Sequence, residues 1–154
     1  MCFSKSFGYA IRGILYVAAL KEKKERVRVD KIAEELKIPR HFLGKILKHL
    51  VKADILNSAQ GQQGGFSVND NTLTTPLLEI AKITEGTDKF SSCILAMRKC
   101  NRASPCPLHG PIELLKTNWY SLLSDYTIES LLQKDPGDIL KTIAPADMEK
   151  EATQ

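Results

Sequence analysis

The chain has 154 residues, of which 43% are hydrophobic and 26% are charged, and its net charge at pH 7 is +4. This composition suits one compact domain with a modest core and excludes an intrinsically disordered chain. No apolar run reaches the roughly 18 to 20 residues that span a bilayer. The nearest run, 10–20, contains Arg12 and lacks the cleavage site of a signal peptide. The sequence therefore predicts a cytoplasmic protein with no membrane segment.

The positive charge is concentrated in the first part of the chain. Residues 1–68 contain 13 Lys and Arg against 6 Asp and Glu, whereas residues 69–154 contain 9 against 12. A basic half joined to a mildly acidic half suggests that one end of the protein meets a polyanion. From charge alone, a solvated loop over 21–28 explains the excess equally well.

The first 39 residues predict two helices separated by a charged loop. Apolar residues recur at a helical period over 4–20. We expect a short extended piece at Val27 and Val29, then Asp30 as the N-cap of a short second helix. Pro39 interrupts the period and pushes the preceding residue away from helical geometry. A turn therefore falls at 37–39, and a third helix begins just after it.

The third helix has an apolar inner face and a basic outer face. We expect its inner face to consist of Phe42, Leu43, Ile46, Leu47, Leu50 and Val51. Two short helices joined by a tight turn, the second with a basic outward face, are typical of a helix-turn-helix. The candidate DNA-binding side chains of this helix are Arg40, His41, Lys45 and Lys48. Each lysine alone could equally be a phosphate contact or plain surface charge.

A Gly-rich turn between two β-prone runs follows the third helix. The runs at 55–58 and 66–68 flank a turn with glycines at 61, 64 and 65, which predicts a β-hairpin. In a winged helix such a hairpin lies beside the DNA backbone, where side-chain amides can donate to phosphates. Gln60, Gln62 and Gln63 are therefore candidate DNA contacts. A phosphate loop fits less well, because no Gly-Lys-Ser/Thr ending is present.

The rest of the chain predicts further helices around an irregular loop. After a turn-rich stretch at 69–76, Thr74 or Thr75 is expected to cap a helix over 76–85 that Gly86 ends. Residues 87–104 have little periodicity and predict a mobile loop. A short return helix is expected at 128–133, and the chain beyond Pro145 is expected to fray.

An apolar stripe with coiled-coil spacing runs along the long helix after this loop. Its residues, spaced 4-3-4-3-4, are Leu108, Ile112, Leu115, Trp119, Leu122 and Tyr126. A lone helix does not need so strict a seam, so the stripe favours a partner helix and a homodimer. Packing of the stripe against its own domain is the alternative. A dimer would present two winged helices to a palindromic site.

Three of the four cysteines are clustered. Cys2 stands apart, whereas the pattern Cys93-x6-Cys100-x5-Cys106-x2-His109 gathers three thiols and an imidazole. In a cytosolic protein such clustering is typical of metal binding or redox chemistry. Zinc accepts such donors but usually takes a tighter knuckle, and two wide gaps suit a bulkier iron–sulfur cluster. Spacing alone leaves an iron–sulfur cluster, zinc and a metal-free thiol switch open, and His109 can also be an ordinary surface residue.

Taken together, these segments resemble the Rrf2 family of winged-helix transcription regulators, which includes IscR, NsrR, RirA and CymR. The resemblance covers roughly residues 1–135. The stretches that carry it are Tyr9-Ala10-Ile11-Arg12, Ile32-Ala33-Glu34-Glu35 with Ile38-Pro39, Phe42-Leu43 with Ile46-Leu47, the Gly61 to Phe66 wing, and the cysteine–histidine run.

The resemblance implies a dimeric regulator whose cluster senses iron–sulfur status, nitric oxide or redox state. By position, Cys93, Cys100 and Cys106 would ligate iron, and His109 matches the histidine that completes a [2Fe–2S] site in IscR, which favours [2Fe–2S] over [4Fe–4S]. NsrR-like members can use an acidic residue from the partner subunit, and Gly8 stands at that position here.

Four other differences from the family pattern affect the predicted DNA contacts and metal ligands. Gln60 replaces a wing arginine, and Gly44 replaces a longer side chain on the third helix. The first cysteine gap is one residue longer than in IscR. Gly110 and Pro111 could delay the start of the long helix and leave His109 in a loop.

The resulting prediction is a mainly α-helical protein with a small β wing. Its parts are a winged helix-turn-helix (1–86), a cysteine-bearing loop (87–106), a dimerisation helix with a return helix (107–135) and a tail (136–154). It would be a sequence-specific DNA-binding regulator, a repressor, tuned by an iron–sulfur cluster. The alternative is a zinc-binding or metal-free winged-helix regulator or interaction module with a thiol switch. An enzyme finds no support, because no nucleophile–base pair or nucleotide-binding motif is present.

Overall fold

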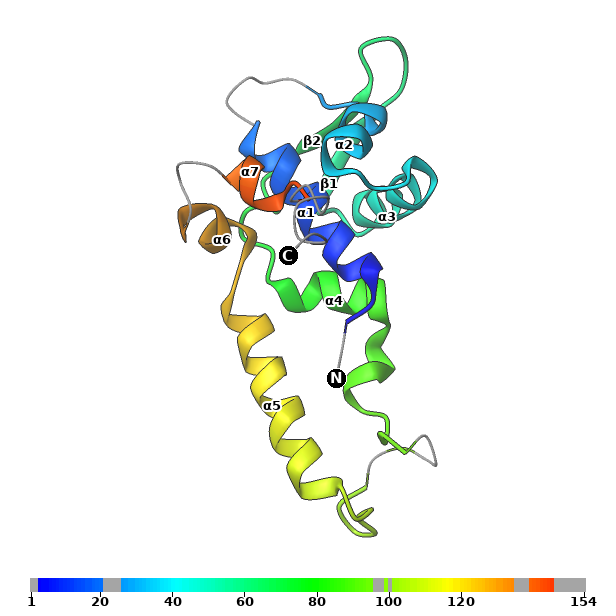
Figure 1. Cartoon of the computed structure of the whole chain (residues 1–154), viewed down its shortest axis with the longest axis vertical. Coiled ribbons are helices and arrows are strands. Elements are labelled where there is room, and N and C mark those ends of the chain that lie inside the picture. The colour runs from blue at the N-terminus through cyan, green and yellow to red at the C-terminus, as the bar shows by residue number, and fades with distance from the viewer. Residues whose placement is uncertain (1–2, 21–25, 96–98, 100, 135–138, 146–154) are drawn as a thin grey trace, which may run out of the picture.

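The computed structural model describes residues 3–20, 26–95, 99, 101–134 and 139–145 (Figure 1). It is mostly helical with one two-stranded antiparallel sheet, which confirms the predicted winged-helix class. The elements are α1 (Lys5–Ala19), α2 (Val29–Leu36), α3 (Arg40–Lys52), β1 (Leu56–Ala59), β2 (Gly65–Val68), α4 (Leu77–Glu85), the 3-10 helix η2 (Thr87–Phe90), α5 (His109–Asp125), α6 (Ile128–Lys134) and α7 (Ile139–Ile143).

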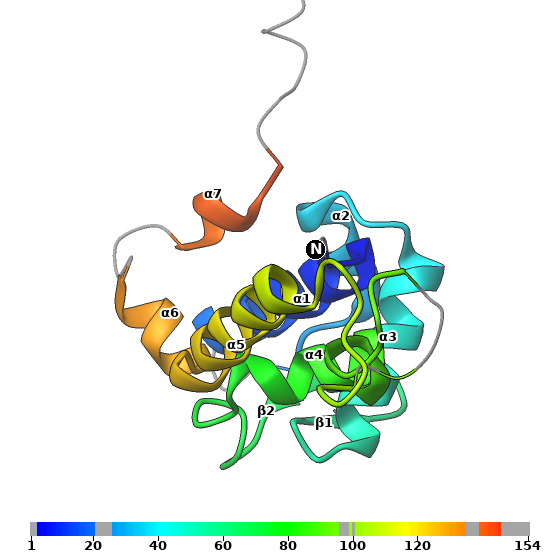
Figure 2. The same ribbon diagram turned by 90° about the horizontal axis from the view of Figure 1, so that it is seen from below.

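A globular head and a projecting arm make up the molecule. Figure 1 shows α1, α2, α3, the sheet, α6 and α7 in the head, while α5 runs away from it beside the segment that follows α4. Within the arm α5 packs against α4, and Figure 2 shows the molecule along the arm. The described residues between η2 and α5 lie at the end of the arm away from the head (Figure 1). None of the described helices is long and apolar enough to cross a membrane.

The core forms around α1. Ala10 and Ile14 of this helix are fully buried together with Leu43, Leu47 and other apolar residues of the head. Gly13 allows α3 to pack closely on α1, because a Cβ at this position would lie 3.3 Å from a methyl carbon of Leu47. The packing of α3 on α1 fixes which face of α3 remains outside.

The turn between α2 and α3 lies where the sequence predicts it. Lys37 takes a left-handed conformation (φ 49°), and the amide of Ile38 donates to the carbonyl oxygen of Ala33 at 3.0 Å. These interactions end α2 in a manner typical of helix C-termini. Pro39 is the N-cap of α3, so its fixed φ separates the two helices.

Two predictions about the start of α2 are wrong. The helix begins at Val29, which is therefore not extended, and Asp30 lies in the first turn rather than at the N-cap. The N-cap is Arg28, because Val27 is tied to the wing by two hydrogen bonds with Phe66, each 2.8 Å. The prediction that Val27 is extended is confirmed by this bridge.

The hairpin forms as predicted. Leu56 pairs with Val68 and Ala59 pairs with Gly65. At Gly65 (φ 145°) a Cβ would lie 2.7 Å from the carbonyl oxygen of Val27, so only glycine allows the bridge to approach. The wing is therefore fixed to the segment that leads into α2.

The prediction that Thr74 or Thr75 caps α4 is wrong. Pro76 is the N-cap and makes no side-chain cap bond, while the hydroxyl of Thr75 donates to the carbonyl oxygen of Asn71 at 2.7 Å. The helix is instead anchored by a bond from the amide of Leu77 to the carbonyl oxygen of Tyr126 at 2.9 Å. A distant segment thus replaces the local cap.

Three further predictions need correction. Phe42 does not belong to the inner face of α3, since 58% of it is exposed. The described part of 87–104 is not structureless, because it contains η2 and a bridge between Ser92 and Lys99. The predicted tail, 136–154, contains a helix that the sequence did not indicate, α7, whose Ile143 is buried in the core. The fraying predicted beyond Pro145 falls on 146–154, which lie outside the described residues.

Candidate DNA-binding surface and metal centre

The outward face of α3 is basic. Arg40, His41, Lys45 and Lys48 are all exposed, while Leu43, Ile46, Leu47 and Leu50 hold the opposite face against the core. The structure therefore brings the four predicted contacts of this helix to its solvent side. Gly44 lies among them, and a Cβ there would meet only Val29, at 3.9 Å. A longer side chain would fit at this position.

A groove separates the wing from the first turns of α2 and α3. It has a volume of about 290 Å³, and the side chains that line it include Arg28, Asp30, Arg40 and Gln60. Both arginines face one carboxylate, since Asp30 forms ion pairs with Arg40 and, at 3.8 Å, with Arg28. Asp30 thus reduces the positive charge of the groove. Sequence patterns did not reveal this pairing, because it joins residues on both sides of the turn.

The tip of the wing is exposed and closely folded. Gln60, Gln62 and Gln63 all point to solvent or lie at the surface. Gly61 has a positive φ of 98°, and the amide of Gly64 donates to its carbonyl oxygen at 3.0 Å. Gln60 lines the groove, while Gln62 and Gln63 are exposed at the tip of the wing.

Two of the predicted thiol ligands lie on the two chain segments that form the arm. Cys93 is buried shortly after η2, and Cys106 is half-buried just before α5; both are thiols. Cys93 lies in a small hollow with Lys89, Ile112 and Leu115. Cys100 lies outside the described residues. Among the residues that the structure describes, no three metal-ligating side chains come together.

His109 begins α5. Its amide donates to the carbonyl oxygen of Cys106 at 2.9 Å, which closes a turn that brings these two residues together. Gly110 and Pro111 therefore do not delay the helix, and Pro111 fits because the amides of a first helical turn need no partner within the helix. His109 thus stands at the first position of the helix and not in a loop.

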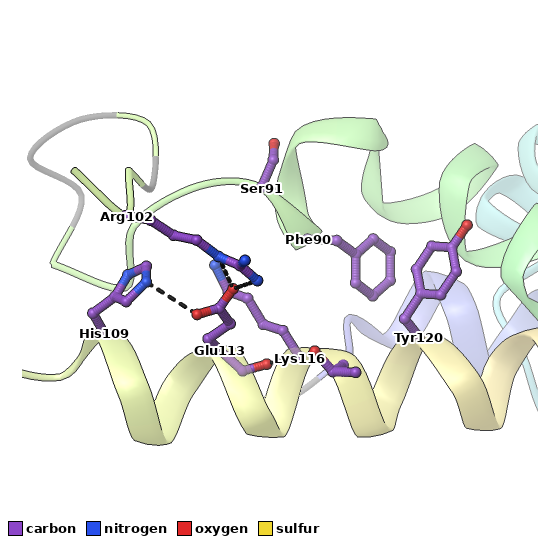
Figure 3. A pocket seen from close by; sticks show the side chains of 8 residues that line it. Phe90, Ser91, Arg102, His109, Glu113, Lys116 and Tyr120 are labelled. Atoms are coloured by element: carbon purple, nitrogen blue, oxygen red, sulfur yellow. Dashed lines mark hydrogen bonds and ion pairs between the residues drawn. The ribbon is translucent and has the colours of Figure 1, made fainter. Parts of the chain in front are cut away.

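Glu113 connects His109 with the cysteine-bearing segment. One of its oxygens, Oε2, lies 3.1 Å from Nε2 of His109, and the other, Oε1, accepts from Nε of Arg102 at 2.7 Å (Figure 3). The hydrogen bond from Arg102 and, to a lesser extent, the nearby His109 hold the pKa of Glu113 below its usual value. Glu113 is therefore an anion at neutral pH. Sequence reasoning missed it, although its spacing of four from His109 on a predicted helix was the available signal.

Arg102, His109 and Glu113 line one hollow of the arm, which has a volume of about 380 Å³. Phe90, Ser91, Lys116, Thr117 and Tyr120 complete its walls (Figure 3). Lys116 donates from Nζ to the carbonyl oxygen of Ser92, next to Cys93. Both sides of the cysteine-bearing segment are thus tied to α5 by charged side chains.

Part of the predicted apolar stripe of α5 faces solvent. Leu108, Leu115 and Leu122, which follow one another at intervals of seven, are 44%, 40% and 45% exposed. Ile112, Trp119 and Tyr126 are half-buried, and the ring of Trp119 meets that of Phe3 edge-on at 5.1 Å. The stripe therefore divides into a leucine row (Leu108, Leu115, Leu122) on the surface and a set that packs against its own chain.

A winged helix with a basic exposed α3 defines the class as a DNA-binding protein of the helix-turn-helix type. The chain belongs to the Rrf2 family, whose model, described as an iron-dependent transcriptional regulator, matches residues 3–134. It is thus a transcription regulator, in a family that is not enzymatic.

Relatives and solved structures agree with this assignment. An HTH-type transcriptional regulator of Aquifex aeolicus is 31% identical, over 86% of this chain and 92% of the relative. The regulator NsrR of Geobacillus kaustophilus is 25% identical, over 81% of this chain and 85% of the relative. The structure of CymR from B. subtilis has a TM-score of 0.70 at 16% identity, covering 87% of this chain and 98% of that one. The structure of IscR from T. potens has a TM-score of 0.66 at 20% identity, covering 97% of this chain and 96% of that one.

Proposed function

We propose that the protein is a homodimeric repressor that binds a palindromic DNA operator. Arg40, His41, Lys45 and Lys48 on α3 would enter the major groove, while Gln60, Gln62 and Gln63 on the wing would contact the adjacent backbone. The exposure of all seven side chains, and the groove that Arg40 and Gln60 line together, support this assignment. The leucine row of α5, joined by the outer edges of Ile112, Trp119 and Tyr126, would form the dimer interface.

We further propose that an iron–sulfur cluster tunes the DNA affinity. Cys93, Cys100, Cys106 and His109 would hold it, and three thiolates with one imidazole favour [2Fe–2S] over [4Fe–4S]. The chemistry of the donor set fits, because Cys93 and Cys106 are thiols and His109 is three residues from Cys106 at the head of a helix. A bound cluster would supply one-electron redox chemistry and reactivity towards oxidants.

One observation carries this proposal. Cys106 and His109 are joined by a backbone hydrogen bond at the first turn of α5, the same helix that exposes the leucine row. A change at the cluster would therefore act on the start of the dimerisation helix. Since that helix would set the separation of the two DNA-binding heads in the proposed dimer, a change at the cluster would reach the operator-binding surface through it.

A metal-free thiol regulator, or one that binds zinc, is the second candidate. It is favoured by the similarity of the fold to that of CymR, which is described as the global cysteine regulator of B. subtilis. In this case the buried Cys93 and the half-buried Cys106 would act through their own oxidation.

Anaerobic reconstitution with iron and sulfide, followed by absorption spectra and DNA-shift assays, distinguishes the candidates. The DNA probe would be a duplex selected by the protein from a random pool. We expect a thiolate-to-iron band near ~400 nm that is lost in Cys106→Ala, together with a changed DNA affinity. Tight zinc binding without a chromophore, or DNA affinity that responds only to a thiol oxidant, would support the second candidate.

A further inference from the structure

We infer that Glu113 is a positioning residue for His109, fixing which imidazole nitrogen would face a cluster. This inference rests on the proposed function, since it concerns the same ligand set. The geometry that points to it is the approach of Oε2 of Glu113 to Nε2 of His109 at 3.1 Å. In a neutral imidazole one nitrogen carries the proton and the other the lone pair. A carboxylate at Nε2 favours the proton there, so Nδ1 would be the nitrogen available to donate to iron.

The surroundings of this pair differ from those of an ordinary surface ion pair. The His109 side chain is 13% exposed and that of Glu113 is 35% exposed, so both are largely covered. Exposed pairs at this helical spacing contribute little, because solvent screens them and both side chains lose freedom. A histidine that binds a metal, by contrast, usually donates its other N–H to a carboxylate or carbonyl, which fixes its ring. Glu113 supplies such a carboxylate from one turn further along the same helix.

Glu113 is also linked to the chain between the second and third cysteines. Arg102, which lies between Cys100 and Cys106, donates to Oε1 of Glu113 at 2.7 Å. The two oxygens are thus divided between the cysteine-bearing segment and the histidine. Through this arrangement, a single side chain orients the imidazole and holds the adjoining segment against α5.

The first measurement needs no cluster. In the metal-free protein, long-range ¹H–¹⁵N spectra report which imidazole nitrogen carries the proton. We expect wild-type His109 to be protonated at Nε2 when neutral, and Glu113→Ala to give a mixture of both forms. Glu113→Gln keeps an oxygen acceptor and should retain much of the wild-type preference. Glu79→Ala is the matched control, because Glu79 makes an ion pair with Lys82 at a similarly close spacing on α4 but does not line the hollow that contains His109.

The second measurement uses the reconstituted full chain. We expect Glu113→Ala to lose iron to a chelator about ten times faster than wild type, with Glu113→Gln between the two. His109→Ala should be impaired as well, and the double variant should be no worse than His109→Ala, because Glu113 acts through the histidine. Thermal unfolding of each variant identifies any that fails to fold, and for such a variant Glu113→Gln provides the comparison.

Three results would overturn the inference. Wild-type tautomer and iron loss in Glu113→Ala, with an impaired His109→Ala, would remove Glu113 from the site while leaving the cluster. A His109→Ala variant with a normal cluster would show that the fourth ligand lies elsewhere. A wild-type chain that takes up no iron or sulfide would refute the proposed cluster itself, and the role of Glu113 with it.

Discussion

Arg12 on α1 donates a hydrogen bond from Nε to the carbonyl oxygen of Ile143, the last residue of α7, at 2.6 Å. Its Nη2 donates to the carbonyl oxygen of Leu36, the last residue of α2, also at 2.6 Å. The final carbonyls of a helix lack partners within it and carry partial negative charge, so a cation stabilises both ends. Burial lowers the pKa of Arg12, but a guanidinium stays charged at any physiological pH.

Replacing Arg12 with alanine should release α7 and loosen the end of α2. A hydrogen bond from a charged group typically contributes about 1.5–3 kcal/mol. We expect the free energy of unfolding to fall by an amount in this range. Compared with wild type, amide hydrogen exchange should accelerate more in 139–143 than in α3. Arg12→Lys keeps the charge but not the forked geometry, and should recover part of the stability. Unchanged exchange in α7 would show that its apolar contacts hold it without Arg12.

Arg12 also illustrates what the sequence could and could not reveal. The helices, the turn at Pro39 and the wing were predictable because they depend on period, proline geometry and glycine, which act within a few residues. The partners of Arg12 lie 24 and 131 positions away, and no local pattern indicates them. α7 was missed for the same reason, since it is a short helix held on α1 by contacts distant in sequence.

In the candidate site, too, local patterns were predictable from the sequence and contacts between distant residues were not. The cysteine spacing and His109 were visible as a pattern, and the exposed basic residues of α3 followed from its period. The position of Phe42 beside the apolar stripe predicts burial, but the side chain borders a hollow between α3, α1 and α4 and stays 58% exposed. The pairing of Asp30 with Arg40 and that of Glu113 with Arg102 depend on tertiary approach, which periodicity does not report.

Glu85 should make the stability depend on pH. Burial acts to raise its pKa, but hydrogen bonds from Lys89 and Ser4 outweigh this effect and lower it. The amide of Ser4 donates to Oε1 of Glu85 at 2.9 Å, which joins the start of α1 to the end of α4. A carboxyl group with a lowered folded-state pKa stabilises above the unfolded value and loses that contribution as pH falls through the folded value.

We therefore expect Glu85→Gln to be less stable than wild type by about 1 kcal/mol at pH 7. The difference should persist down to the ordinary glutamate pKa of about 4.3 and shrink at more acidic pH, where the wild-type carboxylate is protonated. Urea unfolding at pH 7, 5, 4 and 3 measures it. Glu79→Gln, on the exposed face of α4, serves as the control. A difference that stays constant across this range would refute the role of the charge.

Gly64 should be essential for the shape of the wing. A Cβ at this position would lie 2.5 Å from the carbonyl oxygen of Ala59 and 2.9 Å from that of Gly61, so backbone atoms would have to move. We expect Gly64→Ala to destabilise the fold by about 1–3 kcal/mol. DNA affinity should fall at least about tenfold, which is about 1.4 kcal/mol, because the displaced tip no longer follows the backbone of the duplex. Gly8→Ala is the control, since nothing lies within 4 Å of its Cβ; equal DNA affinity in both variants would argue against a DNA-binding wing.

Asp30 should limit the electrostatic affinity for DNA. It forms ion pairs with Arg28 and Arg40 at the groove beside the wing, where a carboxylate would repel phosphates. We expect Asp30→Asn to raise affinity for unselected duplex several-fold at low salt. The slope of log K against log salt should steepen by about one, as one more arginine contacts phosphate. Because the three side chains are exposed, folding stability should change by less than about 1 kcal/mol. Weaker binding would instead indicate that Asp30 holds Arg40 in the conformation that contacts DNA.

The leucine row should determine the oligomeric state. Leu115 lies between Leu108 and Leu122, and a charge there would be buried without a partner in a dimer of α5 helices. We expect Leu115→Glu to be monomeric in sedimentation experiments at concentrations where wild type is dimeric. Its affinity for a palindromic duplex should fall towards that of a half-site. Ser121→Glu adds the same charge at an exposed position of α5 outside the row and should remain dimeric. If Leu115→Glu stays dimeric while its helical content and melting temperature match those of wild type, the interface lies on another surface and the exposed leucines need a different explanation.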